Sequence, residues 1–370
     1  MAIARHRGRI RVCVTPERPG WSLEDRCDLQ HVAAVVTEWI AACDSPLYVH
    51  FARECAADQD LLALIARIDN VPPMNLLFGA VKLSLTTDDA LAEWYPHLAG
   101  DAARAFEPHA FQAFRAYVLE HAALIEEVGR TRRTQTNEVG RAAALMPWIA
   151  AEAQRLNHVS GTPGGPVHVV DVGASAGLNL CLDRFDYNYS GHVVASRAPA
   201  SRVVLECDNR GGFTMPAAPP AVGHRIGLDL APVDVADPAQ AAWLEALVWP
   251  GHEDRLARLR AAIAIRLETD VTMVAGDAAH TLAGLHSTLP PGPVVVFHSV
   301  MAYQLDQAQR AGLDDAVADL ASSRPVARVS MEPLGITKQP QIRVGLRLDD
   351  ATVVASAHPH GRWIDLPEGG

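Results

Sequence analysis

The residues with the clearest chemical potential lie in one short stretch of the chain. An apolar run over 167–172 contains a single acid, Asp171, and leads into a turn that holds Gly173, Ser175 and Gly177. In open α/β sheets, ligands bind where a strand gives way to such a turn and a helix follows. The pattern therefore predicts a ligand site at the carboxyl end of a buried strand.

Two known chemistries account for this segment incompletely. A dinucleotide site needs G-x-G-x-x-G, but Ser175 and Leu178 stand at its second and third glycine positions, and no phosphate-loop lysine follows. A nucleophile elbow, G-x-S-x-G, is satisfied, and His298 follows later in the chain as in α/β-hydrolases. A serine hydrolase that uses Ser175 and His298 stays an alternative, although a long helical segment precedes the turn and an elbow does not account for Asp171.

A third chemistry accounts for more of the chain. The pattern D-x-G-x-x-x-G, typical of class I S-adenosylmethionine-dependent methyltransferases, is matched by Asp171, Gly173 and Gly177. In such folds an acid after the second strand accepts the ribose hydroxyls, and an acid after the third lies near the adenine amino group. Asp229 and Asp277 follow apolar runs in that order. This order of landmarks favours the methyltransferase interpretation over the other two.

The predicted cofactor is S-adenosylmethionine, and the product would be S-adenosylhomocysteine. The residues expected to bind it are Asp171, Gly173, Ser175, Gly177, Asn179, Asp229, Asp277 and Ala278. His298 ends the fourth apolar run, so it is the candidate base at the reaction centre, with Glu332 after the next strand. In most methyl transfers the protein contributes chiefly alignment.

The substrate-binding candidates come from three other segments. Glu138 and Arg141 lie three residues apart on a predicted helix and share a face, where Arg141 would meet an anion. Arg184 precedes an insert over about 186–223, Tyr187 lies in this insert, and Ser299 follows the candidate base. The insert also offers a rival second strand, in which the ribose acid would be Glu206 or Asp208 rather than Asp229.

A metal centre is not predicted. His358 and His360 alternate with a proline and share a face of an extended chain, where His298 would complete a set of three ligands. Because no residues supply the supporting hydrogen bonds that metal-bound histidines use, we predict a loop there instead.

The spacing of apolar residues along the chain predicts two domains. Residues 28–160 repeat apolar positions with helical spacing, whereas in 161–370 short apolar runs alternate with helical stretches, which indicates a mainly parallel sheet. Two final runs flank Asp349 and Asp350 and predict a closing antiparallel hairpin. The fold class is therefore α/β, a Rossmann-like sheet of the class I methyltransferase type, after an all-helical N-terminal domain and an irregular leader over 1–27.

Composition limits the partners. The 370 residues carry 32 Lys and Arg against 43 Asp and Glu, a formal net charge of −11, which disfavours wrapping nucleic acid. No apolar run is long enough to span a membrane. The six cysteines form no C-x-x-C pair, and no secretory leader is recognisable, so the expected compartment is the cytoplasm. A small-molecule substrate is expected, and the oligomeric state stays open.

Several motifs resemble those of DUF2332, a bacterial family of largely unassigned function. They lie at 136–145, 172–180, 227–230, 243–250 and 296–299, with further matches at 45–48, 94–98 and 358–363. The resemblance covers about 28–365. It implies a methyltransferase-like C-terminal domain and names no substrate. The expected function is therefore methyl transfer to a small oxygen or nitrogen nucleophile, and the alternatives are a serine hydrolase and a non-catalytic protein that binds S-adenosylmethionine or a nucleotide.

Overall fold

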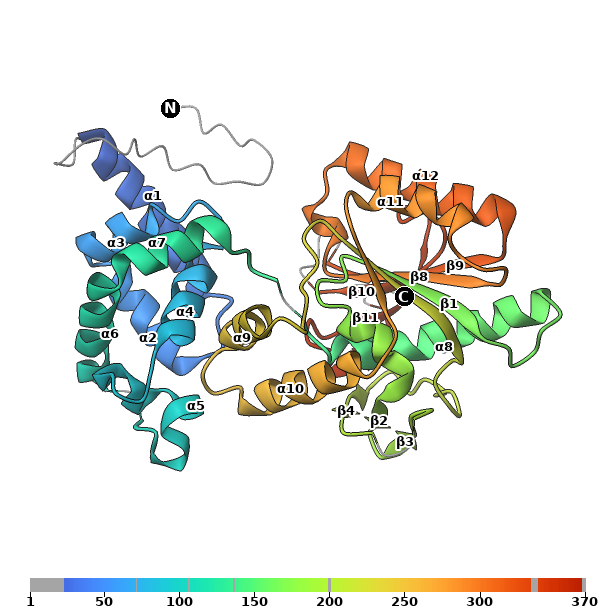
Figure 1. The fold of residues 1–370 in the computed structure, drawn as a ribbon, viewed down its shortest axis with the longest axis horizontal. Helices are drawn as coiled ribbons and strands as arrows, with labels where there is room; N and C mark the ends of the chain where they lie inside the picture. The colour runs from blue at the N-terminus through green and yellow to red at the C-terminus, as the bar shows by residue number, and fades with distance from the viewer. Residues whose placement is uncertain are drawn as a thin grey trace. The chain divides into compact units, whose positions relative to one another are not determined.

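The structure is a computed structural model that describes residues 23–70, 72–105, 107–135, 137–198, 201–333 and 339–367. The chain forms two compact units (Figure 1). The first comprises Met1–Thr136 and Ala242–Ala257, and the second comprises Asn137–Ala241 and Arg258–Gly370. Of the predicted leader, residues 1–22 lie outside the described residues, and the first helix already begins at Leu23.

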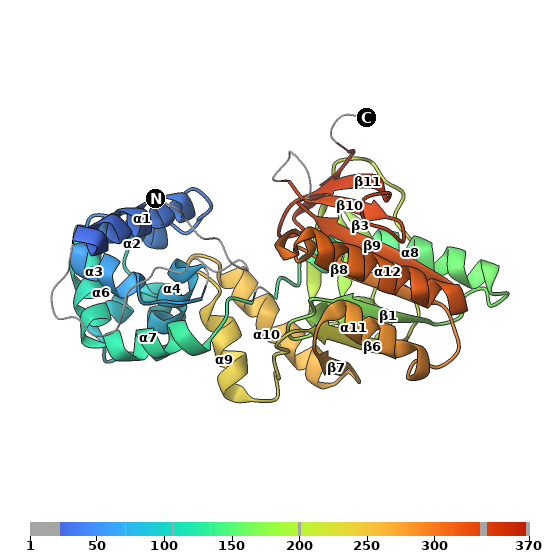
Figure 2. The ribbon, with the colours of Figure 1, turned by 90° about the horizontal axis from the view of Figure 1, so that it is seen from above.

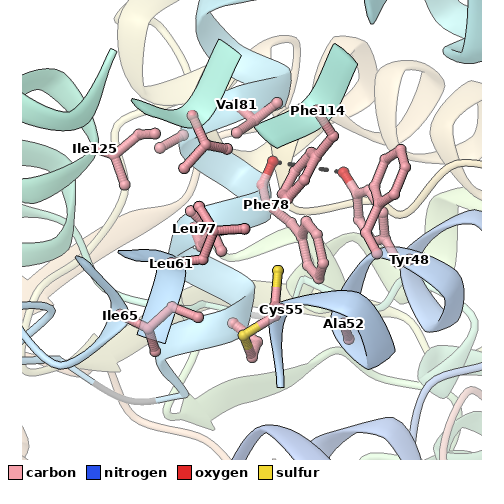
Figure 3. Packing of buried hydrophobic residues seen from close by; sticks show 14 of the residues in the cluster. Tyr48, Ala52, Cys55, Leu61, Ile65, Leu77, Phe78, Val81, Phe114 and Ile125 are labelled. Carbon is pink, nitrogen blue, oxygen red and sulfur yellow. Dashed lines mark hydrogen bonds between the residues drawn. The ribbon is translucent and has the colours of Figure 1, made fainter. Parts of the chain in front are cut away.

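The first unit is helical. Its elements are α1 (Leu23–Ile40), α2 (Pro46–Cys55), α3 (Gln59–Ile65), α4 (Pro73–Ser84), η1 (Ala90–Trp94), α5 (Pro96–Ala99), η2 (Gly100–Ala102), α6 (Pro108–Glu120) and α7 (Ala122–Thr131). Aromatic side chains from three of these helices stack in the core (Figure 3). The rings of Tyr48 and Phe78 lie 4.0 Å apart, and those of Phe51 and Phe114 lie 4.4 Å apart.

A segment from much later in the chain completes this helical core. Residues 242–257 include the end of α9 (Pro238–Ala246) and the start of α10 (Glu253–Leu267). Trp243 packs so closely on Gly79 that a β-carbon there would lie 2.8 Å from the indole ring. The buried Lys82 ammonium donates to the backbone carbonyls of Glu245 and Val248. These contacts explain why this segment belongs to the helical unit.

The second unit is built on a nine-stranded sheet with the order β5-β12-β11-β10-β9-β8-β1-β6-β7. The strands are β1 (Val167–Val172), β5 (Asp208–Asn209), β6 (Val222–Asp229), β7 (Thr272–Ala275), β8 (Val294–Ser299), β9 (Val326–Glu332), β10 (Gln341–Val344), β11 (Thr352–Ala357) and β12 (Trp363–Asp365). Five neighbouring strands of this sheet are mutually parallel, in the order β9-β8-β1-β6-β7. The prediction of a large, mainly parallel sheet in an α/β chain is confirmed, and β10 and β11 form the antiparallel hairpin.

Helices cover both faces of this sheet. The helices α11 (Ala278–Gly284) and α12 (Gln307–Ser323) pack on one face, where Val170, Val294 and Val296 point into a shared apolar core. The helix α8 (Arg141–Val159) lies against β8 and β9 from the other side (Figures 1 and 2). The division between the units therefore lies at 136/137 rather than at 160, because α8 buries its apolar side on the sheet.

The insert after β1 forms a small sheet of its own. Its strands are β2 (Asp186–Tyr189), β3 (His192–Val194) and β4 (Val204–Glu206), in the order β3-β2-β4. Because β4 lies in this small sheet and β5 pairs with β12 at the far edge of the large one, neither continues from β1. The first strand after the insert that pairs with β1 is β6, so Asp229, not Glu206 or Asp208, ends the second strand of the parallel sheet.

No helix in the described part of the chain is long and apolar enough to cross a membrane.

Candidate functional site

The glycine turn lies at the point where the strand order reverses. From β1 the chain goes outward to β6 and β7 on one side and later returns to β8 and β9 on the other. In open α/β sheets, the carboxyl ends of the strands at this reversal are the usual place for a ligand. Gly173 and Gly177 have positive φ angles of 78° and 72°, and Ser175 has a φ of 52°, which is uncommon for a residue with a side chain.

Every backbone amide of the turn is already bonded within the protein. Gly173 and Ala174 donate to the Leu228 carbonyl (2.7 and 3.1 Å), Ser175 donates to the Asp229 carboxylate (2.8 Å), Ala176 donates to the Asn137 side chain (3.0 Å), and Gly177 donates to the Ala174 carbonyl (2.7 Å). The segment that follows, η3 (Leu178–Arg184), is a 3₁₀-helix rather than the predicted α-helix. The turn therefore has neither the spare donors nor the helix dipole that phosphate sites use.

Methionine side chains cover the glycines of this edge. A β-carbon on Gly173 would lie 3.0 Å from the side chain of Met301. A β-carbon on Gly177 or Gly227 would lie 2.8 or 2.5 Å from the sulfur of Met273. A side chain at any of these positions would have to displace a methionine, so glycine permits the close packing between the turn and its neighbours.

Three carboxylates follow one another along the ends of β1, β6 and β7. Asp171 is buried, and no hydrogen bond reaches its carboxylate from the described residues. Burial, reinforced by the nearby Asp229, holds the pKa of Asp171 well above its usual range, while Arg141 opposes the shift. Asp229 accepts from the amides of Ser175 and Ala231 (2.8 and 2.9 Å).

The third carboxylate, Asp277, is exposed and caps α11 by accepting from the amide of His280 (3.1 Å). Ala278 is the first residue of that helix. The structure thus places all three predicted acids at the same edge of the sheet, in the predicted order. Two of them also have structural tasks there, because Asp229 orders the turn and Asp277 caps a helix.

The predicted role of His298 is not supported. Its side chain is completely buried, with Nδ1 2.7 Å from Glu332 and Nε2 accepting from Arg328 Nε (3.0 Å). Burial and the Arg328 cation lower the pKa of His298, so the ring is neutral and donates to Glu332. With both nitrogens occupied, His298 is available neither to Ser175 nor to a substrate.

Glu332 is likewise buried, and it organises the turn after β8. Its oxygens accept from the amides of Met301 and Ala302 at 3.1 Å as well as from His298. Val300, at the start of this turn, has a φ of 53°, a strained value for a β-branched residue. Glu332 therefore has a positioning role and does not reach the surface of the site.

Arg328 connects this carboxylate and histidine to α12. The guanidinium pairs with the carboxylate of Asp314, whose other oxygen accepts from the amide of Leu348 (3.0 Å). Arg328 and Asp314 are both buried, so the chain of contacts from Asp314 to Glu332 is enclosed within the second unit.

Two segments more than 200 residues apart meet at the start of α8. Glu138, buried before the helix, lies 2.9 Å from His360 Nδ1, and Arg141 Nε donates to the Pro359 carbonyl (2.9 Å). The backbones of Gly140 and Gly361 touch, and a β-carbon on either glycine would overlap with the other segment. Glu138 and Arg141 are thus not a surface ion pair, because each is held by the loop after β11.

The remaining predicted residues are dispersed. Tyr187 is buried, and its hydroxyl donates to the Leu182 carbonyl, so it is a core residue and not part of a substrate pocket. Arg184 lines a cavity of about 420 Å³ with the first residues of β6 and β7, at the opposite edge from the glycine turn. Asn179 lies in η3 with a buried side-chain oxygen that lacks a partner among the described residues. Ser299 ends β8 and is half-buried.

Comparison with known proteins gives one match. Residues 31–366 match the family described as an uncharacterized protein conserved in bacteria, DUF2332. The chain belongs to this family. No curated protein and no solved structure matches it. The DUF2332 match covers both segments that meet at Glu138 and His360.

The sequence analysis assigned no role to Asn137 and considered His360 only as a metal ligand. Asn137 holds the glycine turn from both sides, since its amide nitrogen donates to Ser175 Oγ (2.6 Å) and its oxygen accepts from Ala176 (3.0 Å). His360 contacts Glu138, the residue that follows Asn137. Both belong to motifs that carried the family resemblance, but no spacing rule connects two segments so far apart in the chain.

His358, His360 and His298 do not converge on a metal site. The rings of His358 and His360 lie 5.6 Å apart, while His298 is enclosed between Glu332 and Arg328. Across the described residues, no group of three or more potential ligands is arranged to hold a metal ion.

Proposed function

We propose that this DUF2332 protein is an S-adenosylmethionine-dependent methyltransferase that acts on an oxygen or nitrogen nucleophile of a small molecule. One observation carries the proposal: three carboxylates follow the ends of β1, β6 and β7, where every backbone amide of the glycine turn over 173–177 is already bonded. Such an edge suits a ligand that donates hydrogen bonds and carries positive charge. A dinucleotide or nucleoside triphosphate, whose phosphates need donors, fits it poorly.

Each acid can serve a different part of the cofactor. An ionised carboxylate has about four acceptor positions, so Asp229 can hold the two turn amides and still accept from ribose hydroxyls. The exposed Asp277 can accept from the adenine amino group. Asp171 lies near the turn, and a bound cation would favour its ionised form against the effect of burial.

The chain's own residues would chiefly bind and align the reactants. When bound, S-adenosylmethionine would supply the electrophilic methyl group on its sulfonium. The turn that begins at Val300, fixed by Glu332, places Met301 over Gly173 and carries the half-exposed Tyr303. The buried Arg141 interacts electrostatically with both Asp171 and Tyr303, so a cation lies close to this edge for an anionic group of the acceptor. The net charge of −11 favours a small molecule over nucleic acid.

Calorimetric titration of the full chain with S-adenosylmethionine and S-adenosylhomocysteine tests the proposal. We expect both ligands to bind and Asp229→Asn to weaken binding at least tenfold, since it loses an acceptor. Asp350→Asn, in the exposed hairpin turn, is the matched control and should bind as the parent does. If neither ligand produces heat on titration, the cofactor assignment is refuted. If the ligands bind but no methyl group is transferred to any acceptor, a non-catalytic protein is favoured.

A further inference from the structure

Glu138 and His360 form a carboxylate–histidine pair of unequal exposure. The Glu138 side chain is 2% exposed and the His360 side chain is 29% exposed, with 2.9 Å between Glu138 Oε2 and His360 Nδ1. In such a pair the carboxylate accepts from one ring nitrogen and leaves the other as the acceptor. The Nε2 atom of His360 has no partner among the described residues.

The carboxylate itself is firmly held. Glu138 Oε1 accepts from the amide of Gly140 (3.1 Å), and Arg258 Nη1 lies 3.9 Å away from the same oxygen. The His360 backbone is fixed as well, since its amide donates to His358 Nδ1 (3.1 Å) and its carbonyl packs on Gly140. Both partners of the pair are therefore fixed before any ligand arrives.

The pair is adjacent to the proposed cofactor edge. Asn137, the residue before Glu138, bonds the glycine turn at Ser175 and Ala176. A single short segment thus holds the turn with one residue and orients the histidine with the next.

From these relationships we propose that His360, oriented by Glu138, is the general base of the site. Three features support this role: an accessible ring nitrogen, a buried carboxylate that fixes the tautomer, and proximity to the ligand edge. His298, which the sequence favours, lies at the end of the strand beside β1 but lacks the first feature, because both of its ring nitrogens are bonded within the protein. The role as a general base rests on the proposed function. The geometry of the Glu138–His360 pair, here called the dyad, does not.

In the proposed step, the proton of the nucleophile passes to His360 Nε2. The unshared pair of the nucleophile's oxygen or nitrogen forms the bond to the methyl carbon. The carbon–sulfur bond breaks, and its electrons remain on sulfur, which leaves as a neutral thioether. The protonated imidazole is stabilised by Glu138 and then releases its proton to water.

Several charged or titratable groups surround the pair. They are Glu138 and Arg141 at the start of α8, Arg258 on α10, His358 and Arg362 on the same loop, and Arg210 after β5. Burial and neighbouring cations lower the pKa of His358 to about 4, so His358 stays neutral near pH 7. Glu138 is the carboxylate in contact with the His360 ring.

Nitrogen NMR of histidine-labelled protein tests the geometry without any cofactor. We expect His360 to carry its proton on Nδ1 at pH 8, and Glu138→Leu to abolish this preference. A proton on Nε2, or a ring that exchanges between tautomers in the parent chain, would overturn the inference. His192→Gln, an exposed histidine in the small sheet, is the control and should leave the His360 signals unchanged.

Formation of S-adenosylhomocysteine, measured with a bacterial small-molecule extract as acceptor source, tests the role. We expect His360→Gln to lower the rate at least 100-fold at pH 7, within the range of general base catalysis, while S-adenosylhomocysteine binds with unchanged affinity. Glu138→Gln should also lower the rate, because the glutamine amide can donate to Nδ1 and no longer fixes the tautomer in which Nε2 is the acceptor. A His360→Gln rate within threefold of the parent would overturn the inference alone, whereas failure of both ligands to bind would refute the proposed function and leave the NMR test to decide the dyad.

Discussion

Gly140 and Gly361 meet backbone against backbone, and this contact joins the start of α8 to the loop after β11. The Gly361 α-carbon faces the carbonyl group of Gly140, and the Gly140 α-carbon faces the carbonyl oxygen of His360. Only glycine permits this approach at both positions, and Gly361 also has a φ of 70°. The same contact brings Glu138 to His360, so the packing of two glycines sets the geometry of the dyad.

The substitution Gly361→Ala should destabilise the second unit strongly. A β-carbon there overlaps with the Gly140 backbone, and the left-handed backbone conformation adds its own cost. Together, overpacking and strain amount to about 2–5 kcal/mol. Thermal unfolding followed by calorimetry should show a fall in Tm of roughly 5 °C or more.

A second glycine separates the two causes. Gly212 has a φ of 63°, but a β-carbon on it would meet no atom within 4 Å. Gly212→Ala should therefore cost only the backbone term, about 1–2 kcal/mol. Equal effects of the two substitutions would show that the overlap with Gly140 contributes nothing.

The buried ion pair between Arg328 and Asp314 predicts a large loss of stability. Asp314→Asn removes the charge that compensates the Arg328 guanidinium, which is 2% exposed. Leaving a buried charge without its partner costs about 3–5 kcal/mol. Urea unfolding of the variant should show a midpoint well below that of the parent.

The next residue provides a matched control for this prediction. Asp315 pairs with Arg347 at 2.7 Å, but both side chains are exposed. Asp315→Asn should leave the urea midpoint unchanged within error, because solvent screens such a pair. A comparable loss in both variants would show that burial does not determine the effect.

Sequence patterns predicted the large sheet because each strand carries its own local signal. The acids at 171, 229 and 277 could be placed at one edge, since parallel strands align their carboxyl ends. The pattern did not reveal that α8 packs on the sheet, because an amphipathic helix does not specify which surface covers its apolar face.

The chemistry of the site was less predictable than its location. His298 ends a strand in the expected place, but only the fold shows that Arg328 and Glu332 occupy both of its nitrogens. The pairing of Glu138 with His360 spans 222 residues and follows from tertiary packing. Such contacts leave no periodic trace in a single sequence.

Ser175 should not behave as a catalytic nucleophile. Its hydroxyl oxygen accepts from Asn137, and His298, the base that the hydrolase alternative requires, is bonded elsewhere. A fluorophosphonate probe is expected to leave Ser175 unmodified, as judged by mass spectrometry of the digested protein. Stoichiometric labelling that disappears in Ser175→Ala would instead establish the hydrolase alternative.

Asp171 should destabilise the protein, and increasingly so as the pH rises. Its pKa in the folded chain is well above its usual value, so the folded state retains a proton that the unfolded state loses above about pH 4. Folding stability therefore decreases as the pH rises from this point to the folded-state pKa. Asp171→Asn removes the charge but keeps the shape, so the variant should match the parent at low pH and exceed it in Tm at pH 7 and above.

The pH dependence distinguishes this effect from a simple change in packing. A packing change would alter Tm by the same amount at every pH, whereas loss of a buried ionisable group predicts a difference that grows with pH and then levels off. Asp277→Asn tests the specificity of the result, because Asp277 is exposed and caps α11. Its substitution should leave Tm nearly unchanged at every pH, because asparagine caps a helix about as well as aspartate does. A more stable Asp171→Asn chain that binds S-adenosylhomocysteine less tightly would show that this acid is kept for binding at the expense of stability.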